Sequence, residues 1–132
     1  MHHVAIMKKS WGFLEKIANE EKTIESRWYT AKRPPWDGVA AGDVIYFKNS
    51  GEPVTLKANV ERVLQFSDLT PRRVRAILSK YGRQDGIASA EIPKFYRMFK
   101  NKKYCIFMFL RTLEHVTPFH INKTGFGAMS AW

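Results

Sequence analysis

Three charged residues, Lys22, Glu25 and Arg27, lie close together in one short segment and form the most distinctive polar pattern of the chain. This segment alternates between apolar and polar residues and is rich in β-branched and aromatic types, which predicts a strand. On a strand, Glu25 and Arg27 share one face, while Ile24 and Trp28 point to the other face and suit the core. The pattern therefore predicts a carboxylate between two cations on a rigid element.

These charged side chains have the chemistry to bind a polar ligand. Arg27 can contact a phosphate or the edge of a base through two hydrogen bonds. Glu25 can accept a hydrogen bond from an exocyclic amine, and Lys22 adds a point charge. The simpler interpretation is an ion pair that faces solvent and contributes about 0–1 kcal/mol to stability. Spacing alone favours the simpler interpretation.

Aromatic residues and a glycine-containing tail supply further candidates for ligand binding. The candidates for stacking on a base are Trp11, Trp36, Phe126 and Trp132. Core packing is the alternative for each, and it is favoured for Trp11, which lies on the apolar stripe of an expected helix. In the tail, Lys123, Gly125 and Phe126 belong to a stretch whose glycines permit close approach of the backbone to a ligand. The alternative is a turn that places Trp132 on the sheet.

Several other kinds of chemistry lack their usual motifs. The four histidines do not have the spacing of a metal site. The single cysteine, Cys105, excludes an intrachain disulfide and a cysteine-rich zinc site. No serine stands in the G-x-S-x-G motif of hydrolases. The sequence therefore predicts no metal site and no cofactor.

Positive charge is concentrated in one segment. The formal net charge is +10, and most of the excess lies between Thr70 and Lys103, where the acidic residues are Asp85 and Glu91. Concentrated positive charge attracts polyphosphate, so we expect a nucleic-acid partner. The residues expected to contact its backbone are Arg72, Arg73, Arg75, Lys80, Lys100, Lys102 and Lys103. The alternative is a solvated basic face.

The spacing of apolar residues predicts about six strands and two or three helices. Strands are expected at residues 4–7, 23–29, 43–48, 54–66, 104–112 and 115–121. One helix should follow Ser10 as its N-cap, a second should run from Thr70 and Pro71 to Tyr81, and a third should cover residues 92–99. Hairpins rather than βαβ crossovers join the strands. The predicted fold class is therefore α+β, a small mixed β-barrel with helices at its mouth.

Length and composition limit the class of protein. A chain of 132 residues has the usual size of one domain, so we expect a single domain over residues 1–132. Hydrophobic residues make up 45% and charged residues 26%, as in a globular protein rather than a disordered one. The longest apolar run, residues 104–110, is far shorter than the roughly 20 residues of a membrane helix. We therefore expect a soluble, cytoplasmic protein of undetermined oligomeric state.

A family resemblance rests on three segments of the chain. The first is Glu21-Lys22-Thr23-Ile24-Glu25-Ser26-Arg27, which resembles the G-x-K-x-x-E-x-R signature of the activating signal cointegrator homology (ASCH) domain. The second is Gly42-Asp43-Val44-Ile45, at the start of an expected strand. The tail, residues 118–132, resembles the subgroup that contains the endothelial-overexpressed lipopolysaccharide-associated factors. Glu21 stands where the family often has glycine, so we expect the turn before Lys22 to differ in shape.

This resemblance implies a PUA-like β-barrel, the fold of several RNA-modifying proteins. It also implies that Lys22, Glu25 and Arg27 line a cleft between the barrel and its helices. The loop around Trp36 and residues 123–126 should then close the rim of this cleft. The implied function is the binding of RNA or of a modified nucleotide.

Two other functions remain open. Some small ASCH proteins are amidohydrolases that remove the acyl group from acylated cytidine with a Lys, a Thr and a Glu, the Thr lying three residues after the Lys. That position is Glu25 here, so the hydroxyl is missing. In a variant of this mechanism Glu25 activates water as a general base and Lys22 stabilises the oxyanion. The other function is a protein-interaction module whose basic surface binds an acidic protein partner.

Overall fold

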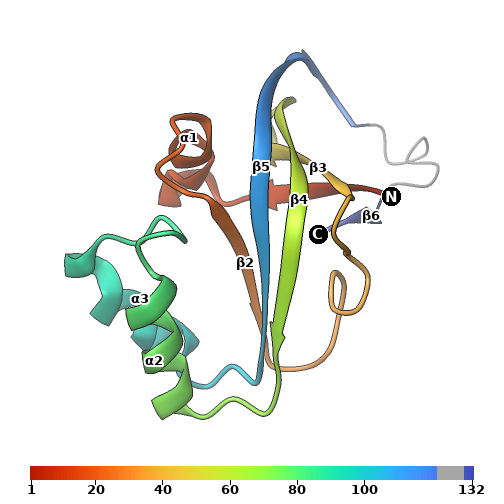
Figure 1. Cartoon of the computed structure of the whole chain (residues 1–132). Helices are drawn as coiled ribbons and strands as arrows, with labels where there is room; N and C mark the ends of the chain where they lie inside the picture. The colour runs from red at the N-terminus through yellow and green to blue at the C-terminus, as the bar shows by residue number, and fades with distance from the viewer. Residues whose placement is uncertain (122–129) are drawn as a thin grey trace.

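The computed structural model describes residues 1–121 and 130–132, which form a curled sheet with helices on one side (Figure 1). The strands are β1 (His2–Met7), β2 (Ile24–Tyr29), β3 (Val44–Asn49), β4 (Val54–Phe66), β5 (Tyr104–Phe119) and β6 (Ser130–Ala131). The helices are α1 (Phe13–Ala18), α2 (Pro71–Tyr81) and α3 (Ile92–Phe99), with 3-10 turns at Lys9–Trp11 and Ser89–Glu91. The α+β class that the sequence predicts is confirmed.

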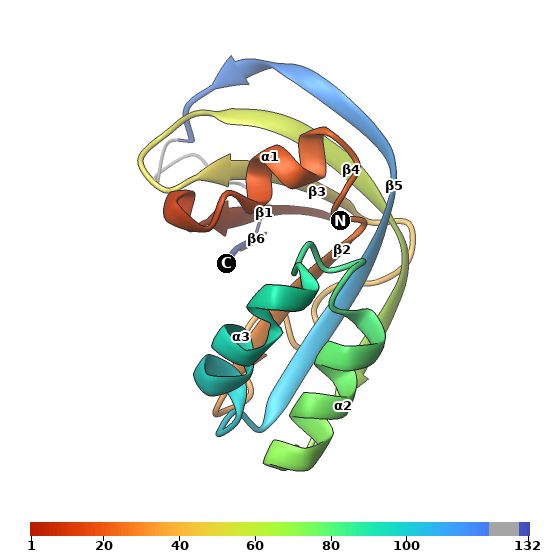
Figure 2. The same ribbon diagram turned by 90° about the vertical axis from the view of Figure 1, so that its left-hand side faces the viewer.

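The sheet is mixed and curls into a half-barrel. Its strand order is β2-β5-β4-β3-β1-β6, and β1 runs parallel to β3 and β6 while the other pairs are antiparallel. Register shifts interrupt the long β4–β5 pair, and such bulges bend strands and increase twist. The curl brings β2 toward the end of β1 (Figure 2), where the Arg27 guanidinium donates to the Ile6 carbonyl at 3.2 Å. An open seam therefore separates these two strands.

Helix α2 forms where the sequence predicts it. The Thr70 hydroxyl caps its N-terminus by accepting a hydrogen bond from the Arg73 amide at 3.3 Å. Pro71 takes the first helical position, where the absent N–H costs no bond. Val74, Ile77 and Leu78 are buried. The basic residues of the helix are exposed, namely Arg72, Arg73, Arg75 and Lys80. The amphipathic pattern thus places positive charge on the outer face of the helix.

Strand β5 supplies the centre of the core. Every residue from Cys105 to Phe109 is buried, and Phe107 packs edge-on against Tyr81 of α2 with 5.1 Å between ring centroids. Because both faces of this part of the strand are covered, its sequence is continuously apolar rather than alternating. Burial raises the pKa of the Cys105 thiol well above its ordinary value, which fits an inert core residue.

Two predicted boundaries are wrong. Ser10 does not cap the first helix, because Gly12 adopts a left-handed φ of 70° and ends the turn that contains Ser10 before α1 begins. The two strands expected at residues 104–112 and 115–121 form one continuous strand, β5. A bulge takes the place of the expected break, since Thr112 has a φ of 53° and the β4–β5 register shifts there.

No helix among the described residues is long and apolar enough to cross a membrane.

Candidate functional site: a pocket at the seam of the half-barrel

A pocket of about 260 Å³ opens at the seam between β2 and β1. Among the described strands β2 pairs only with β5, so its other edge is free, and residues 25–29 all line the pocket. Its polar wall contains Glu25, Ser26, Arg27 and Asp85, and its aromatic wall contains Trp11, Phe13, Trp28 and Phe99. The pocket therefore combines an apolar surface with convergent hydrogen-bonding groups, the usual composition of a small-molecule site.

Lys22 lies behind the pocket wall and not in it. Its ammonium donates to the backbone carbonyl and to the Oδ1 atom of Asp85, each at 2.6 Å, and lies 4.5 Å from the centre of the Phe13 ring. The side chain is completely enclosed, and Lys22 is not among the residues that line the pocket. This arrangement differs from the expected point charge in the cleft, and it gives Lys22 the role of a buried counter-ion.

Asp85 is the site residue that sequence reasoning missed. It is fully buried, and its second carboxylate oxygen accepts a hydrogen bond from the Ser26 hydroxyl at 2.7 Å. Burial raises the pKa of the Asp85 carboxyl, and the opposing influence of Lys22 and Ser26 does not cancel this effect. Its one sequence signal is its position, since it is an acidic residue followed by glycine inside a strongly basic segment.

Gly86 allows Lys22 and Asp85 to meet. Its φ is +83°, a conformation that other residues rarely adopt, and a Cβ atom there would lie 3.1 Å from the Cβ and Cδ atoms of Lys22. Its carbonyl also accepts a hydrogen bond from the Lys16 ammonium at 2.6 Å. The turn after α2 therefore packs directly on the lysine side chain.

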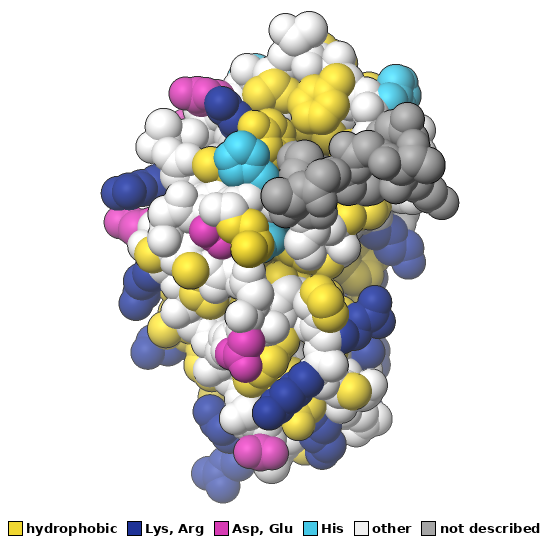
Figure 3. Space-filling view, turned by 90° about the vertical axis from the view of Figure 1, so that its right-hand side faces the viewer, with side chains coloured by type: hydrophobic (Ala, Val, Ile, Leu, Met, Phe, Trp, Pro, Cys, Tyr) yellow, Lys and Arg dark blue, Asp and Glu magenta, His cyan; other side chains and the backbone are white. Residues whose placement is uncertain are grey.

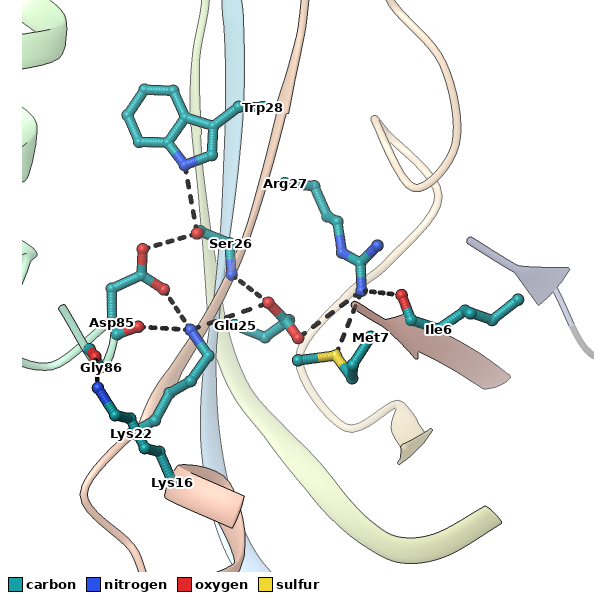
Figure 4. A network of polar contacts seen from close by, with 10 residues as sticks. All are labelled: Ile6, Met7, Lys16, Lys22, Glu25, Ser26, Arg27, Trp28, Asp85 and Gly86. Atoms are coloured by element: carbon teal, nitrogen blue, oxygen red, sulfur yellow. Dashed lines mark hydrogen bonds and ion pairs between the residues drawn. The ribbon is translucent and has the colours of Figure 1, made fainter. Parts of the chain in front are cut away.

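Glu25 and Arg27 form the opposite part of the polar wall (Figure 4). The Glu25 side chain is buried, and its Oε1 atom accepts from the Ser26 amide at 2.8 Å. Its Oε2 atom lies 3.8 Å from an Arg27 nitrogen, which is beyond hydrogen-bond distance. Among the described residues, neither Glu25 Oε2 nor Arg27 Nε has a hydrogen-bond partner. Buried polar atoms without partners are rare in proteins, so these two atoms are candidates for hydrogen bonds to a ligand.

Strand alternation separates two polar groups along β2. Figure 4 shows Ser26 and Trp28 directed toward Asp85, and Glu25 and Arg27 directed toward Ile6 and Met7 of β1. Strand alternation places Ser26 on the same side of β2 as Trp28. Its hydroxyl accepts from the Trp28 indole at 3.2 Å and donates to Asp85, so this side contains a hydrogen-bond chain as well as packing.

The aromatic wall is built around Trp28. Its indole stacks on Phe99 of α3 with 4.8 Å between centroids and 6° between planes. Trp11 lies edge-on to Phe13 and Phe95, and it remains partly exposed at the pocket. Sequence reasoning treated Trp28 as core only, because a strand pattern does not indicate that the covering layer leaves a pocket.

The other expected site residues lie elsewhere. Trp36 lines a second pocket, of about 340 Å³, rather than the first. Lys123, Gly125 and Phe126 fall outside the described residues. Trp132 lies beside the first pocket, where the Arg27 guanidinium is 5.0 Å from the centre of its ring.

The basic candidates are on the surface and away from the first pocket. All of Arg72, Arg73, Arg75, Lys80, Lys100 and Lys103 are exposed, and Lys102 is partly exposed. None of them lines that pocket. Within residues 1–121 and 130–132, no cluster of three or more His, Cys, Asp or Glu side chains has the geometry of a metal site.

The turn before Lys22 contains the glycine position of the ASCH-like signature. In the G-x-K spacing this position is Glu20, which corrects the placement at Glu21. Glu20 has a φ of 65°, the left-handed conformation that glycine favours. Glu20 therefore holds a backbone conformation to which glycine is better suited.

Comparison with solved structures identifies the fold. The ASCH protein from Zymomonas mobilis has a TM-score of 0.65 at 21% identity, over 89% of this chain and 72% of that protein. The hypothetical protein PH0355 has a TM-score of 0.55 at 23% identity, over 88% of this chain and all of that protein. No family model matches the sequence, and no curated protein matches it. The chain therefore shares its fold, a curled sheet in a half-barrel with helices, with these two structures.

Proposed function

We propose that this protein is an ASCH domain that binds RNA or a modified nucleotide and holds one base in the pocket at the β1–β2 seam. The observation that carries the proposal is the pair of unpartnered buried atoms, Glu25 Oε2 and Arg27 Nε. They place a hydrogen-bond acceptor beside a donor on the wall of an aromatic pocket. We include in this proposal that the tail, residues 118–132, resembles the tail of the endothelial-overexpressed lipopolysaccharide-associated factors.

Nucleobases have the complementary pattern. Each base edge presents ring or exocyclic N–H donors next to carbonyl or ring-nitrogen acceptors. Glu25 accepts from such an amine, and Arg27 donates to the neighbouring acceptor. The aromatic wall supplies stacking, which is how proteins hold unpaired bases. The volume of about 260 Å³ is just below the usual range of roughly 300–1,000 Å³ for ligand sites, which suits a single base.

The basic surface supplies the second part of the proposed interaction. The exposed cations of α2 and of the segment after α3 give the molecule a phosphate-attracting field without entering the pocket. In this proposal the pocket selects the base, and the surface attracts the polyanion to which it belongs. An acidic protein partner would use the same surface and leave the pocket empty.

A panel of nucleosides and nucleotides tests the proposal by thermal shift. A ligand present at 100 times its Kd adds about 2.7 kcal/mol to the free energy of unfolding, so the Tm of the wild type should rise measurably. Arg27→Ala and Glu25→Gln should abolish that rise. Arg62→Ala is the matched control, because Arg62 is also stacked on an aromatic ring, 4.0 Å from the centre of Phe109, but does not line the pocket. Absence of any shift in the wild type would refute the proposal.

A hydrolase is the second candidate, and the Ser26–Asp85–Lys22 chain favours it. A serine hydroxyl at 2.7 Å from a carboxylate base is the arrangement of an activated nucleophile. In this mechanism Asp85 takes the Ser26 proton while Oγ attacks the acyl carbon. The leaving amine then takes that proton, and water hydrolyses the acyl-serine ester. Lys22 holds the base in place. This differs from the sequence-based variant, in which Glu25 activates water.

Acylated cytidine separates the hydrolase from the binding protein. A hydrolase should release free acid and cytidine without added metal, and Ser26→Ala should abolish release while the variant still binds the product. No turnover by the wild type across neutral pH would exclude this second candidate and leave the binding proposal unchanged.

A further inference from the structure

A second pocket lies where the loop between β2 and β3 meets the N-terminal strand. It has a volume of about 340 Å³, and its walls include His3, Lys32, Arg33, Trp36 and Ser130. Figure 3 views the side of the molecule on which this loop and the N-terminus lie, with Lys and Arg side chains along its margins and hydrophobic side chains between them. None of these five residues lines the first pocket.

Lys32 and Arg33 are cations without compensating charges. Both are exposed, and neither belongs to an ion pair among the described residues. Among the described residues that line the pocket there is no Asp or Glu side chain. The pocket therefore has a net positive field available to an anion.

Trp36 provides an aromatic surface next to these cations. It is partly exposed, it packs edge-on against Tyr104 with 5.1 Å between centroids, and the Lys32 ammonium lies 6.0 Å from its ring centre. The loop that carries it is fixed by hydrogen bonds, including Trp36 N to Arg33 O at 2.9 Å and Asp37 N to the Gln65 side chain at 2.7 Å. A preformed surface of this kind loses little conformational entropy on binding.

Two sets of contacts connect the second pocket with the first. Tyr29, at the end of β2, lines the first pocket, and the Arg33 guanidinium lies 4.9 Å from the centre of its ring. Trp132 lies under Arg27 of the first pocket, and its indole donates to His3 of the second pocket at 3.4 Å. Tyr29 and Trp132 therefore link the two pockets through direct contacts.

We propose that the second pocket binds the nucleotide adjoining the one held in the first pocket, so that the ligand is a single-stranded oligonucleotide rather than a free nucleoside. Arg33 and Lys32 contact the phosphodiester between the two nucleotides, and Trp36 stacks on the second base. A cation pair beside an exposed aromatic ring is the combination that proteins use for single strands. This inference rests on the proposed function of the first pocket.

Calorimetry with nucleosides and with RNA dinucleotides that contain the same base tests this inference. Dinucleotides should bind the wild type about fivefold tighter or more, because the stacking of one base contributes about 1–3 kcal/mol. A double variant, Lys32→Ala with Arg33→Ala, should lose this gain and bind nucleosides as the wild type does. Trp36→Leu should give the same result, and Arg62→Ala should change neither affinity.

The outcomes distinguish the two proposals. If nucleosides bind normally but dinucleotides bind no tighter, or if the double variant keeps the gain, the second pocket is not a nucleotide subsite and the first proposal stands. If neither nucleosides nor dinucleotides bind, both proposals fail. Binding of a glutamate pentapeptide, lost in the double variant and accompanied by no gain for dinucleotides, would overturn the inference in favour of an acidic protein partner.

Discussion

The ammonium of Lys22 and the carboxylate of Asp85 depend on each other, because both are enclosed by protein. A buried ion pair contributes little net stability, but the loss of one member leaves an unpaired charge in the interior. Lys22 is therefore better explained as the support of Asp85 and of the polar wall than as a ligand contact. Ser26, which donates to Asp85, receives its position from the same pair.

Asp85→Ala should lower the free energy of unfolding by about 3–5 kcal/mol, since it removes the carboxylate at 2.6 Å from the buried Lys22 ammonium and leaves the more distant Glu25 Oε1, at 3.9 Å, as the remaining ion-pair partner among the described residues. Urea unfolding at neutral pH measures this change. Lys57→Ala is the control, because its ion pair with Glu114 at 3.3 Å is substantially exposed and should contribute no more than about 1 kcal/mol. Equal and small effects of the two substitutions would contradict the role assigned to Asp85.

The raised pKa of Asp85 predicts the sign of a pH dependence. Burial makes the folded state hold this proton more tightly than the unfolded chain does. The contribution of Asp85 to stability is therefore greatest below its unfolded pKa of about 4, and it declines as pH rises through the folded pKa. The difference in unfolding free energy between the wild type and Asp85→Asn should decrease with pH in that window. An increase would show that the ion pair with Lys22 outweighs burial.

At the level of elements, the turn after α2 positions the inner wall of the pocket. Gly86 permits this turn through its φ of +83° and through its contact with Lys22. Its neighbour Asp85 then reaches a hydroxyl on β2, 59 residues away in the sequence. The contact between Asp85 and Ser26 therefore depends on the close packing of Gly86 against Lys22.

Gly86→Ala should destabilise the protein more than Gly51→Ala does. Both glycines have a positive φ, so both substitutions introduce similar backbone strain, on the order of 1 kcal/mol. Only at Gly86 would the added methyl group meet Lys22 at 3.1 Å, whereas nothing lies within 4 Å at Gly51. The difference between the two unfolding free energies measures the contact. If the two substitutions cost the same, the turn does not pack on Lys22 as described.

Local patterns predicted the elements better than they predicted the site. Alternation placed Glu25 and Arg27 on one side of β2 because the period of a strand is a local property. The start of α2 was predictable for the same reason, because the capping by Thr70 and the position of Pro71 depend only on neighbouring residues. Ser10 failed as a cap because the left-handed Gly12 overrides a good capping residue. Asp85 could not be predicted, since its role arises only when a distant turn reaches β2.

At the scale of the whole molecule, the charge and the pocket occupy separate regions. The basic residues of α2 are exposed and do not line the first pocket. Figure 2 shows α2 on the helical side of the molecule, apart from β1. Composition predicts the attraction to a polyanion, but it does not predict where the base would bind. The Trp36 region illustrates this limit, because the family resemblance implies that its loop closes the rim of the first pocket, whereas Trp36 lines the second pocket.

Salt dependence tests the role of the basic surface. If α2 contacts RNA phosphates, the logarithm of the affinity should fall linearly with the logarithm of salt concentration, with a slope of about −0.7 per contact. Reversing the charges of Arg72, Arg73 and Arg75 together should flatten that slope and leave the fold intact, because all three are exposed. An unchanged slope in the triple variant would exclude this helix from the nucleic-acid interface.

The most direct test of the central claim is a crystal structure of the protein with the nucleoside that raises its Tm most. We predict that the base lies inside the seam pocket, against the aromatic wall, with its edge within hydrogen-bond distance of Glu25 Oε2 and Arg27 Nε. A base bound elsewhere, with these two atoms still unpartnered, would contradict the account.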